Sequence, residues 1–258
     1  MATLHDPQGV SLSLLAVAAS ALETYPLIVV AATAATDSQV MIRLREIGAT
    51  VVPGGLAGEG RRAALAAAGP EHPAYFSCDF DRWLHWARFW PEELLALPAR
   101  VARLGSRSRT PPWYVCLGRT ARAFGTHPAV QRLPEAATNR ALSVAAGRSL
   151  DAAAGAAWLT LEAAKIVLAG SCEPSAATDL EWPALILHHD PTKLRGLRCE
   201  GLEWETPDFH VEEIAVAGGL QAWTRAAFDT PAMWAARLRL AAASGAALER
   251  VLGEEIPG

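Results

Sequence analysis

The stretch LIVVAATAATDSQVMIRLREIGATVVPG, residues 27–54, decides the fold class. It begins with a continuous apolar, β-branched run at 27–32, which is typical of a strand buried on both faces. A helical segment follows at 37–48, with Asp37 at the N-cap position and Gly48 as the C-terminal stop. The run ATVVPG at 49–54 predicts a second strand. A strand, a helix and a strand in this order indicate a parallel pair joined by a crossover helix.

The same alternation continues through the first half of the chain. The sequence predicts a helix at 58–69, a third strand at 74–78, a helical stretch at 83–105 broken at Pro91, and a fourth strand at 113–118. Apolar strands separated by helices indicate a mostly parallel sheet covered by helices on both faces. We therefore expect an α/β fold.

The second half is less regular. Its pattern predicts helices at 133–147 and 159–170, strands at 182–189 and 197–205, and helical structure from 217 to 252. We expect one domain over residues 1–258, with 217–258 as a helical C-terminal extension. This extension could form a homodimer, cover the site or lie on a membrane, and its alanine-rich face favours packing on the domain.

Composition narrows the classes of partner. The chain has 258 residues, 51% of them hydrophobic, and a net charge of -4 without a run of Lys or Arg, so we expect no nucleic-acid partner. No apolar run reaches the roughly 20 residues of a membrane-spanning helix, so we expect no transmembrane segment. The four cysteines have neither zinc-ligand spacing nor a disulfide framework, which favours a cytoplasmic location.

Polar side chains follow three of the predicted strands. Ligands of open parallel sheets bind at the carboxyl ends of the strands, so these side chains are expected to share one crevice. They are Thr33 and Asp37 after the first strand, Gly60 and Arg61 after the second, and Asp79 and Asp81 after the third. The glycine-rich stretch 53–62 that carries Arg61 either brings backbone N–H groups and an arginine to a phosphate or is a flexible loop.

The segment Asp79-Phe80-Asp81 carries the strongest chemical signal. In an extended chain the two carboxylates point the same way while Phe80 turns into the core. Such a pair can bind Mn²⁺ or Mg²⁺ while a substrate diphosphate completes the shell. Without a cation the carboxylates repel, and one of them tends to keep its proton. In the alternative interpretation, Asp81 caps the following helix and Asp79 pairs with Arg82 or another arginine.

This order of strands, Thr/Asp turn, Gly-Arg helix and Asp-x-Asp resembles the GT-A fold of nucleotide-sugar glycosyltransferases, in particular the large family of dolichol-phosphate mannosyltransferase-like enzymes. The resemblance covers residues 25–190. It implies that Ala32, Thr33 and Asp37 lie near the nucleoside and Arg61 near its base. It also implies that Asp79 and Asp81 hold a divalent cation against the diphosphate. The acidic pair usual in the first turn is replaced here by AATAATD, which leaves Asp37 alone.

A second match lies in SLDAAAGAAWLTLEAAKIVL, residues 149–168, which looks like the family's D-x-x-x-G segment. The resemblance places Asp151 and Gly155 in the sugar and acceptor site, where a glycine lets a sugar approach the backbone. Asp151 is alternatively an N-cap. Asp179, in TDLEW, is a further acidic candidate on the acceptor side. His188 ends a predicted strand and is either a cleft residue or a hydrogen-bonded structural histidine.

These features together predict an enzyme that transfers a sugar from a nucleoside diphosphate sugar to a hydroxyl acceptor. Asp79 and Asp81 are the expected ligands of Mn²⁺ or Mg²⁺, and Asp151 and Asp179 are the candidate catalytic carboxylates. The first alternative is a nucleotidyltransferase that forms nucleoside diphosphate sugars. The second is a binding protein that has the fold without the activity.

Overall fold

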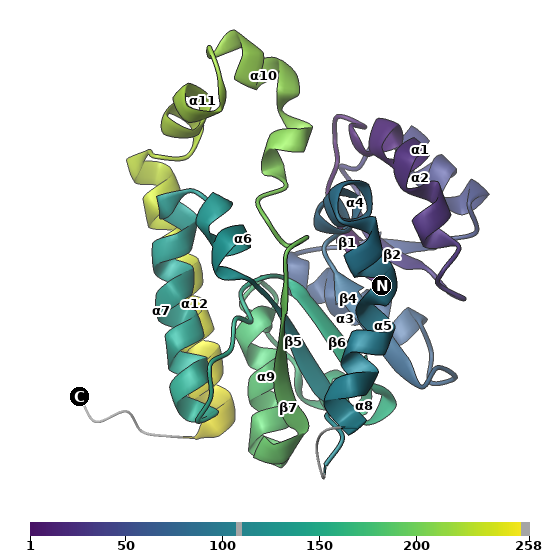
Figure 1. The fold of residues 1–258 in the computed structure, drawn as a ribbon, viewed down its shortest axis with the longest axis vertical. Helices are drawn as coiled ribbons and strands as arrows, with labels where there is room; N and C mark the ends of the chain where they lie inside the picture. Colours follow the sequence, from purple (N-terminus) through teal and green to yellow (C-terminus); the bar gives the residue numbers. More distant parts are fainter. Residues whose placement is uncertain (107–109, 254–258) are drawn as a thin grey trace.

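Two β-sheets lie side by side at the centre of the molecule, with helices around them (Figure 1). The computed structural model describes residues 1–106 and 110–253. The first sheet has the order β1-β2-β3 and is entirely parallel. Its strands are β1 (Ala2–Leu4), β2 (Val29–Thr33) and β3 (Thr50–Gly54). The expected parallel pair over residues 27–54 is thus confirmed.

The second sheet is mixed and has the order β4-β6-β5-β7. Its strands are β4 (Ala74–Cys78), β5 (Tyr114–Arg119), β6 (Ala156–Thr160) and β7 (Leu194–Cys199). Strand β6 runs antiparallel to both of its neighbours, whereas β5 and β7 are parallel. The predicted α/β class is therefore confirmed, with one antiparallel strand inserted in the second sheet.

The two sheets meet where β1 adjoins β4. The backbone N–H of Cys78 donates a hydrogen bond to the carbonyl oxygen of Met1 at 3.2 Å. The chain runs from β1 outward through β2 and β3 and then returns to β4 on the other side of β1. Such a reversal is a topological switch point, and ligands of α/β sheets bind at the carboxyl ends of the strands beside it.

Twelve α-helices connect and cover the strands in the described part of the chain. Those of the first half are α1 (Ser11–Leu22), α2 (Ser38–Glu46), α3 (Ala57–Ala67), α4 (Phe80–Phe89) and α5 (Pro91–Ser106). The later ones are α6 (Ala121–Thr126), α7 (Ala129–Ala145), α8 (Leu161–Gly170), α9 (Thr178–His189), α10 (Val211–Val216), α11 (Leu220–Ala227) and α12 (Pro231–Leu252). None of these described helices is both long and apolar enough to cross a membrane.

Strand β2 shows why the run at 27–32 is apolar throughout. Alternate side chains of a strand point to opposite faces of the sheet. Val30 and Ala32 belong to the hydrophobic cluster that includes α1, α4 and α5, whereas Val29 and Ala31 belong to the cluster that includes α3 and α8. Both faces of the sheet are therefore buried, as the continuous apolar pattern predicts.

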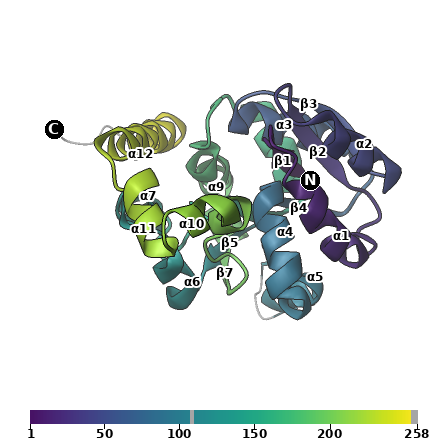
Figure 2. The same cartoon turned by 90° about the horizontal axis from the view of Figure 1, so that it is seen from above.

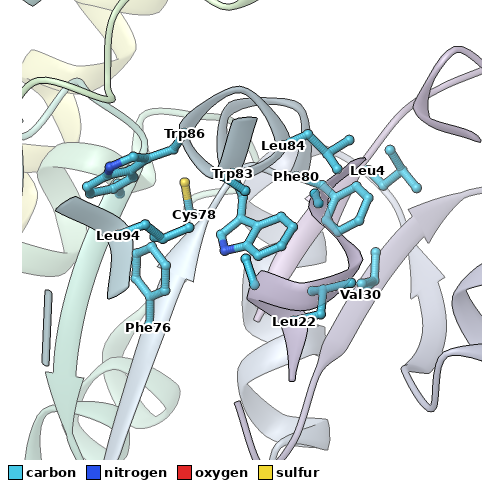
Figure 3. Packing of buried hydrophobic residues seen from close by; sticks show 14 of the residues in the cluster. Leu4, Leu22, Val30, Phe76, Cys78, Phe80, Trp83, Leu84, Trp86 and Leu94 are labelled. Carbon is cyan, nitrogen blue, oxygen red and sulfur yellow. The ribbon is translucent and has the colours of Figure 1, made fainter. Parts of the chain in front are cut away.

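Helix α4 is anchored by aromatic side chains that point into the core (Figure 3). Phe80 stacks on Trp83 with ring centroids 6.0 Å apart, and Trp86 meets Phe76 of β4 edge-on at 6.0 Å. All four rings are buried. Burying each contributes about 1.5–3 kcal/mol, so the β4–α4 turn is held firmly in place. This turn contains the Asp-x-Asp segment.

The helical C-terminal extension is confirmed as helical, and its last helix belongs to the body of the protein. Helix α12 packs along α7 and α9, as the two orthogonal views show (Figures 1 and 2). The predicted packing of its alanine-rich face on the domain is confirmed. Residues 254–258 lie outside the described part of the chain. A homodimer through this helix stays a prediction.

Four details of the predicted secondary structure are wrong. Residues 182–189 form most of helix α9 and not a strand. The prediction failed because a short buried apolar run has the same sequence pattern in a helix and in a strand. Strand β6 begins the segment that was predicted as helix from residue 159. Strand β1 was missed because three residues give no periodic pattern. The strand predicted at 197–205 starts earlier, at Leu194, and ends at Cys199.

Candidate functional site

A polar cavity of about 270 Å³ lies at the carboxyl end of β4, bordered by α7, α9 and α12. Five carboxylates and three guanidinium groups line it, which gives a net charge of -2 when all are ionised. The acidic residues are Asp79, Asp81, Glu135, Asp179 and Glu205, and the basic ones are Arg61, Arg82 and Arg237. The cavity adjoins the β1–β4 switch point, where the topology favours a ligand site.

Asp79 occupies the N-cap position of α4 but makes no capping hydrogen bond with its side chain. Its two carboxylate oxygens accept hydrogen bonds from Nη2 of Arg61 at 3.1 and 3.0 Å. One of them also accepts from the hydroxyl of Thr3 at 2.8 Å. Burial raises the pKa of Asp79, but the charges of Arg61 and Arg82 outweigh it, so the pKa lies below its ordinary value. Pairing of Asp79 with an arginine, foreseen in the alternative interpretation, is therefore observed.

Arg61 joins three elements at this point. It projects from α3, its side chain is only 6% exposed, and it pairs with Asp79 at the end of β4. Its Nη1 donates to Oδ1 of Asp179 at 2.6 Å and to the hydroxyl of Thr178 at 3.0 Å, both on α9. The sequence placed Arg61 correctly in the same crevice as Asp79, although the contact is to a carboxylate rather than to a ligand.

Asp81 lies in the first turn of α4 and lines the same cavity as Asp79, while Phe80 between them is buried. Both carboxylates therefore reach the same cavity, although Asp81 does so from the first turn of a helix and not from the predicted extended segment. Oδ1 of Asp81 accepts from the backbone N–H of Arg82 at 2.8 Å, and its second oxygen has no hydrogen-bond partner among residues 1–106 and 110–253. Burial, followed by the charges of Glu205 and Asp79, raises the pKa of Asp81 to about 7. Asp81 is therefore the carboxylate that tends to keep its proton.

Glu205 is a cavity residue that the sequence reasoning missed. Its Oε1 accepts from Nη2 of Arg82 at 3.0 Å, and Nη1 of Arg82 donates to the carbonyl oxygen of Ala154 at 2.6 Å. Its Oε2 is buried and has no hydrogen-bond partner within the described residues. The acidic character of GLEWE was visible in the sequence, but the sequence separation of 123 between Arg82 and Glu205 left their contact unpredictable from local pattern.

Asp179 and Gly155 lie in the cavity as expected for a ligand site. Burial raises the pKa of Asp179 to about 6, against the charge of Arg61. Gly155 has φ +65°, and a Cβ there would be 2.8 Å from Oδ2 of Asp79. Its carbonyl oxygen accepts from the backbone N–H of Asp79 at 3.3 Å. A glycine is required at this position by both the backbone conformation and the close approach.

The expected residues after β2 lie apart from the cavity. Ala32 and Thr33 end β2, and Asp37 caps α2 by accepting from the backbone N–H of Gln39 at 2.7 Å. None of these three lines the cavity. Strand β1 separates β2 from β4, so the first turn is displaced from the Asp-x-Asp segment by one strand. The three strand ends therefore converge only in part.

Gly60 has a packing role in the structure. A Cβ on Gly60 would come within 3.1 Å of the Thr3 side chain, so the glycine lets α3 lie close to β1. The next residue on the same helix is Arg61, which pairs with Asp79. Gly60 itself does not line the cavity.

Asp151 does not line the cavity, in contrast to the expected role in the sugar site. It is 5% exposed, and its carboxylate accepts from the backbone N–H, Nε and Nη2 of Arg119 and from Nδ2 of Asn139, at 2.6–2.9 Å. Burial raises the pKa of Asp151, but the hydrogen bonds and charge of Arg119 hold it below its ordinary value. A carboxylate satisfied in this way has a structural role, which corrects the catalytic assignment.

His188 is also placed differently from expectation. Because residues 182–189 are helical, His188 lies in the last turn of α9, where it is exposed and outside the cavity lining. Its ring faces that of His189 at 6.4 Å. A substrate-binding role in this cavity is therefore not possible in the observed fold.

The cavity residues fit a divalent cation whose shell is completed by a ligand. Within the described ranges, no group of three or more His, Cys, Asp or Glu side chains could hold a metal alone. Asp81 has a free oxygen, and Oδ2 of Asp79 accepts one hydrogen bond, which leaves it one lone pair. A charge of +2 also matches the excess of two carboxylates in the lining. Two carboxylates plus phosphate oxygens are a usual set for Mg²⁺.

Comparison with known proteins gives no relative. No protein-family model, no curated protein and no solved structure matches the chain. The functional reading therefore rests on the geometry of the site.

Proposed function

We propose that the protein is a glycosyltransferase that moves a sugar from a nucleoside diphosphate sugar to a hydroxyl acceptor, with Mn²⁺ or Mg²⁺ held by Asp79 and Asp81. The observation that carries the proposal is Asp81: it is half-buried in the cavity, where Asp79 and Glu205 raise its pKa, yet one of its oxygens has no partner in the described chain. An ionised carboxylate in this position is costly without a cation. The mostly parallel α/β sheet and the site at its switch point support a GT-A-like fold.

The cation, when bound, would neutralise the charge that develops on the leaving diphosphate. The chain's own residues hold the site in shape. Arg61 fixes Asp79 with two hydrogen bonds and keeps Asp179 within 2.6 Å, and Gly155 leaves space beside the Asp79 carboxylate. Preorganised groups of this kind do not have to reorient during the reaction.

Asp179 is the favoured general base. A base works best when its pKa lies near the working pH, and the pKa of Asp179 is raised to about 6. In the proposed reaction Asp179 accepts the proton of the acceptor hydroxyl as that oxygen attacks the anomeric carbon, and the bond to the diphosphate breaks. Binding of the nucleoside by Ala32, Thr33 and Asp37 remains a prediction, since strand β1 lies between these residues and the cavity.

A second candidate function is binding without catalysis. It is favoured by the contacts of Asp79, whose two oxygens are both already held by Arg61. In a binding protein this ion pair would replace the cation.

The test is isothermal titration of UDP-, GDP- and ADP-sugars with and without Mn²⁺, on the wild type and on Asp79→Asn and Asp81→Asn. We expect donor binding that depends on Mn²⁺ in the wild type and is lost in both variants. Glu162→Gln, which changes an exposed carboxylate on α8, is the control and should bind like the wild type. Donor affinity that is the same with and without Asp81 would refute the cation site. Donor binding without transfer to any acceptor or water would favour the second candidate.

A further inference from the structure

One face of α12 forms a wall of the polar cavity. Arg237, Leu240, Ala241 and Ser244 line it, at positions i, i+3, i+4 and i+7 of the helix. Residues at this spacing lie on the same side of a helix. Helix α12 packs along α7 and α9, so this wall is fixed relative to the carboxylates (Figure 2). The cavity is therefore completed by the last described helix.

Arg237 differs from the other two arginines of the cavity in its contacts. Arg61 and Arg82 both donate hydrogen bonds to oxygens of the protein. Arg237 makes none within the described chain; its nearest acidic partner is Glu135, at 3.7 Å from Nη1 to Oε1. That distance is too long for a hydrogen bond. The side chain is 27% exposed, so its guanidinium donors remain available in the cavity.

Ser244 adds a second available donor on the same helix face. The residue is 5% exposed and lines the cavity, and its hydroxyl makes no hydrogen bond to any residue of the described ranges. Its oxygen is not one of the buried atoms that lack a partner, so it is accessible from the cavity. A ligand that lies along this helix face, over the two turns of about 10 Å between Ser244 and Arg237, would contact both groups.

We propose that Arg237 and Ser244 form a phosphate-binding subsite on α12. The proposal rests on the glycosyltransferase function above and names the chemistry that this wall recognises. A guanidinium with free donors binds phosphate in a bidentate manner, and a neighbouring hydroxyl adds one hydrogen bond. Burial lowers the pKa of Arg237, which shows that the nearby carboxylates do not fully compensate its charge. An anion supplied by a ligand would compensate it.

Two sources of this phosphate have the same chemistry. In the first, it belongs to the leaving diphosphate and is shared between Arg237 and the cation at Asp79 and Asp81. In the second, it belongs to a phosphorylated acceptor and meets Arg237 and Ser244 alone. When all lining groups are ionised, the net charge of -2 opposes an anion in both cases, and only in the first case does the divalent cation offset it.

The test is isothermal titration with inorganic pyrophosphate and with inorganic phosphate, each with and without Mn²⁺. The wild type is compared with Arg237→Gln and Ser244→Ala, and with Arg239→Gln as the control. Arg239 lies two residues further along α12, is exposed and does not line the cavity. We expect Arg237→Gln to weaken binding of the anion about 10- to 100-fold and Ser244→Ala about 3- to 10-fold. Arg239→Gln should leave it unchanged.

The pattern among the probes identifies the source of the phosphate. Pyrophosphate binding that needs both Mn²⁺ and Arg237 supports the leaving diphosphate, and metal-independent phosphate binding that needs Arg237 supports a phosphorylated acceptor. Equal affinity of the wild type and Arg237→Gln overturns the proposal, as does absence of anion binding by the wild type. A subsite that binds pyrophosphate through Arg237 without any sugar transfer would refute the proposed function while leaving the subsite in place. Far-UV circular dichroism and the unfolding midpoint confirm that the variants fold.

Discussion

Asp81→Asn should make the cation-free protein more stable at neutral and alkaline pH. The pKa of Asp81 is raised from its ordinary value of 3.8 to about 7, and each pKa unit corresponds to 1.36 kcal/mol. A fully ionised Asp81 therefore destabilises the fold by about 4 kcal/mol. Loss of a negative charge from the first turn of α4 costs about 0.3–1 kcal/mol, while the asparagine keeps an acceptor for the backbone N–H of Arg82. The side chain is partly solvated, so we expect a net gain of about 2–3 kcal/mol at pH 8.5.

The stability difference between the wild type and Asp81→Asn should depend on pH. Because the folded protein holds the Asp81 proton more tightly than the unfolded chain does, wild-type stability falls as the pH rises from about 4 to about 7. Asp179, whose pKa is raised to about 6, adds to the fall in the same direction. The variant lacks the Asp81 contribution. The two proteins should thus have similar stabilities at pH 4 and separate steadily up to pH 8.

Urea denaturation at pH 4, 6 and 8.5, with the slope m held common, measures the difference. A repeat with saturating Mn²⁺ should stabilise the wild type and leave Asp81→Asn unchanged, because a ligand that binds only the native state adds to its stability. A variant that is no more stable than the wild type at pH 8.5 would contradict the electrostatic account of the site. A gain of the same size at pH 4 would do so as well.

Two further substitutions test how the site is held together. Arg61→Met should lower the free energy of unfolding by about 3–5 kcal/mol in urea denaturation at pH 7, because it removes the arginine that pairs with Asp79 and Asp179. The triple variant that also carries Asp79→Asn and Asp179→Asn should recover most of this loss. Gly155→Ala should lower both stability, by about 1–3 kcal/mol, and Mn²⁺ affinity in a titration, since its Cβ would meet Asp79 at 2.8 Å. Gly147→Ala is the matched control, with φ +62° and open space around the added Cβ, so an equal loss of Mn²⁺ affinity there would refute the role of Gly155.

The β4–α4 turn could be predicted because its signals are local. Neighbouring residues are enough to predict the buried strand at 74–78, the Asp-x-Asp segment after it and the aromatic helix that follows. The two carboxylates do reach one cavity, but the predicted extended segment is replaced by the first turn of α4 at Asp81. Arg61 was assigned to the same crevice through the order of strands. Local pattern was therefore sufficient for the part of the site built by consecutive residues.

The remainder of the site depends on contacts that no local pattern records. Asp151 looked catalytic because of its spacing from Gly155, but Arg119, which lies 32 residues away, occupies its carboxylate. Glu205 reaches the cavity only because the segment after β7 returns to α4. The Arg237 wall likewise depends on where α12 packs. Burial and pairing between distant residues determine the surroundings of these side chains, and neither can be derived from the local pattern of a single sequence.

The unpredicted strand β1 accounts for the displaced first turn. The resemblance took 27–32 as the first strand, whereas β1 precedes it and lies between β2 and β4. The turn after β1 does contain an acidic residue, Asp6, but both of its oxygens accept backbone N–H groups, from Val10 at 3.1 Å and Ser11 at 2.8 Å. Asp6 therefore caps the start of α1, and it cannot replace the acidic pair that the resemblance implies without releasing these bonds.

Asp79 and Asp81 have unequal surroundings, so their two carboxylates differ in charge compensation. Arg61 already neutralises Asp79 in the cation-free protein, so in the proposed site Asp79 would share its carboxylate between Arg61 and the cation. Asp81 has no such partner in the described part of the chain, and its ionisation opposes folding of the cation-free protein. A cation should consequently be drawn to the carboxylate that the fold leaves uncompensated. Stability and cation binding then pull in opposite directions at Asp81, which is the pattern expected where a fold keeps a destabilising residue for its chemistry.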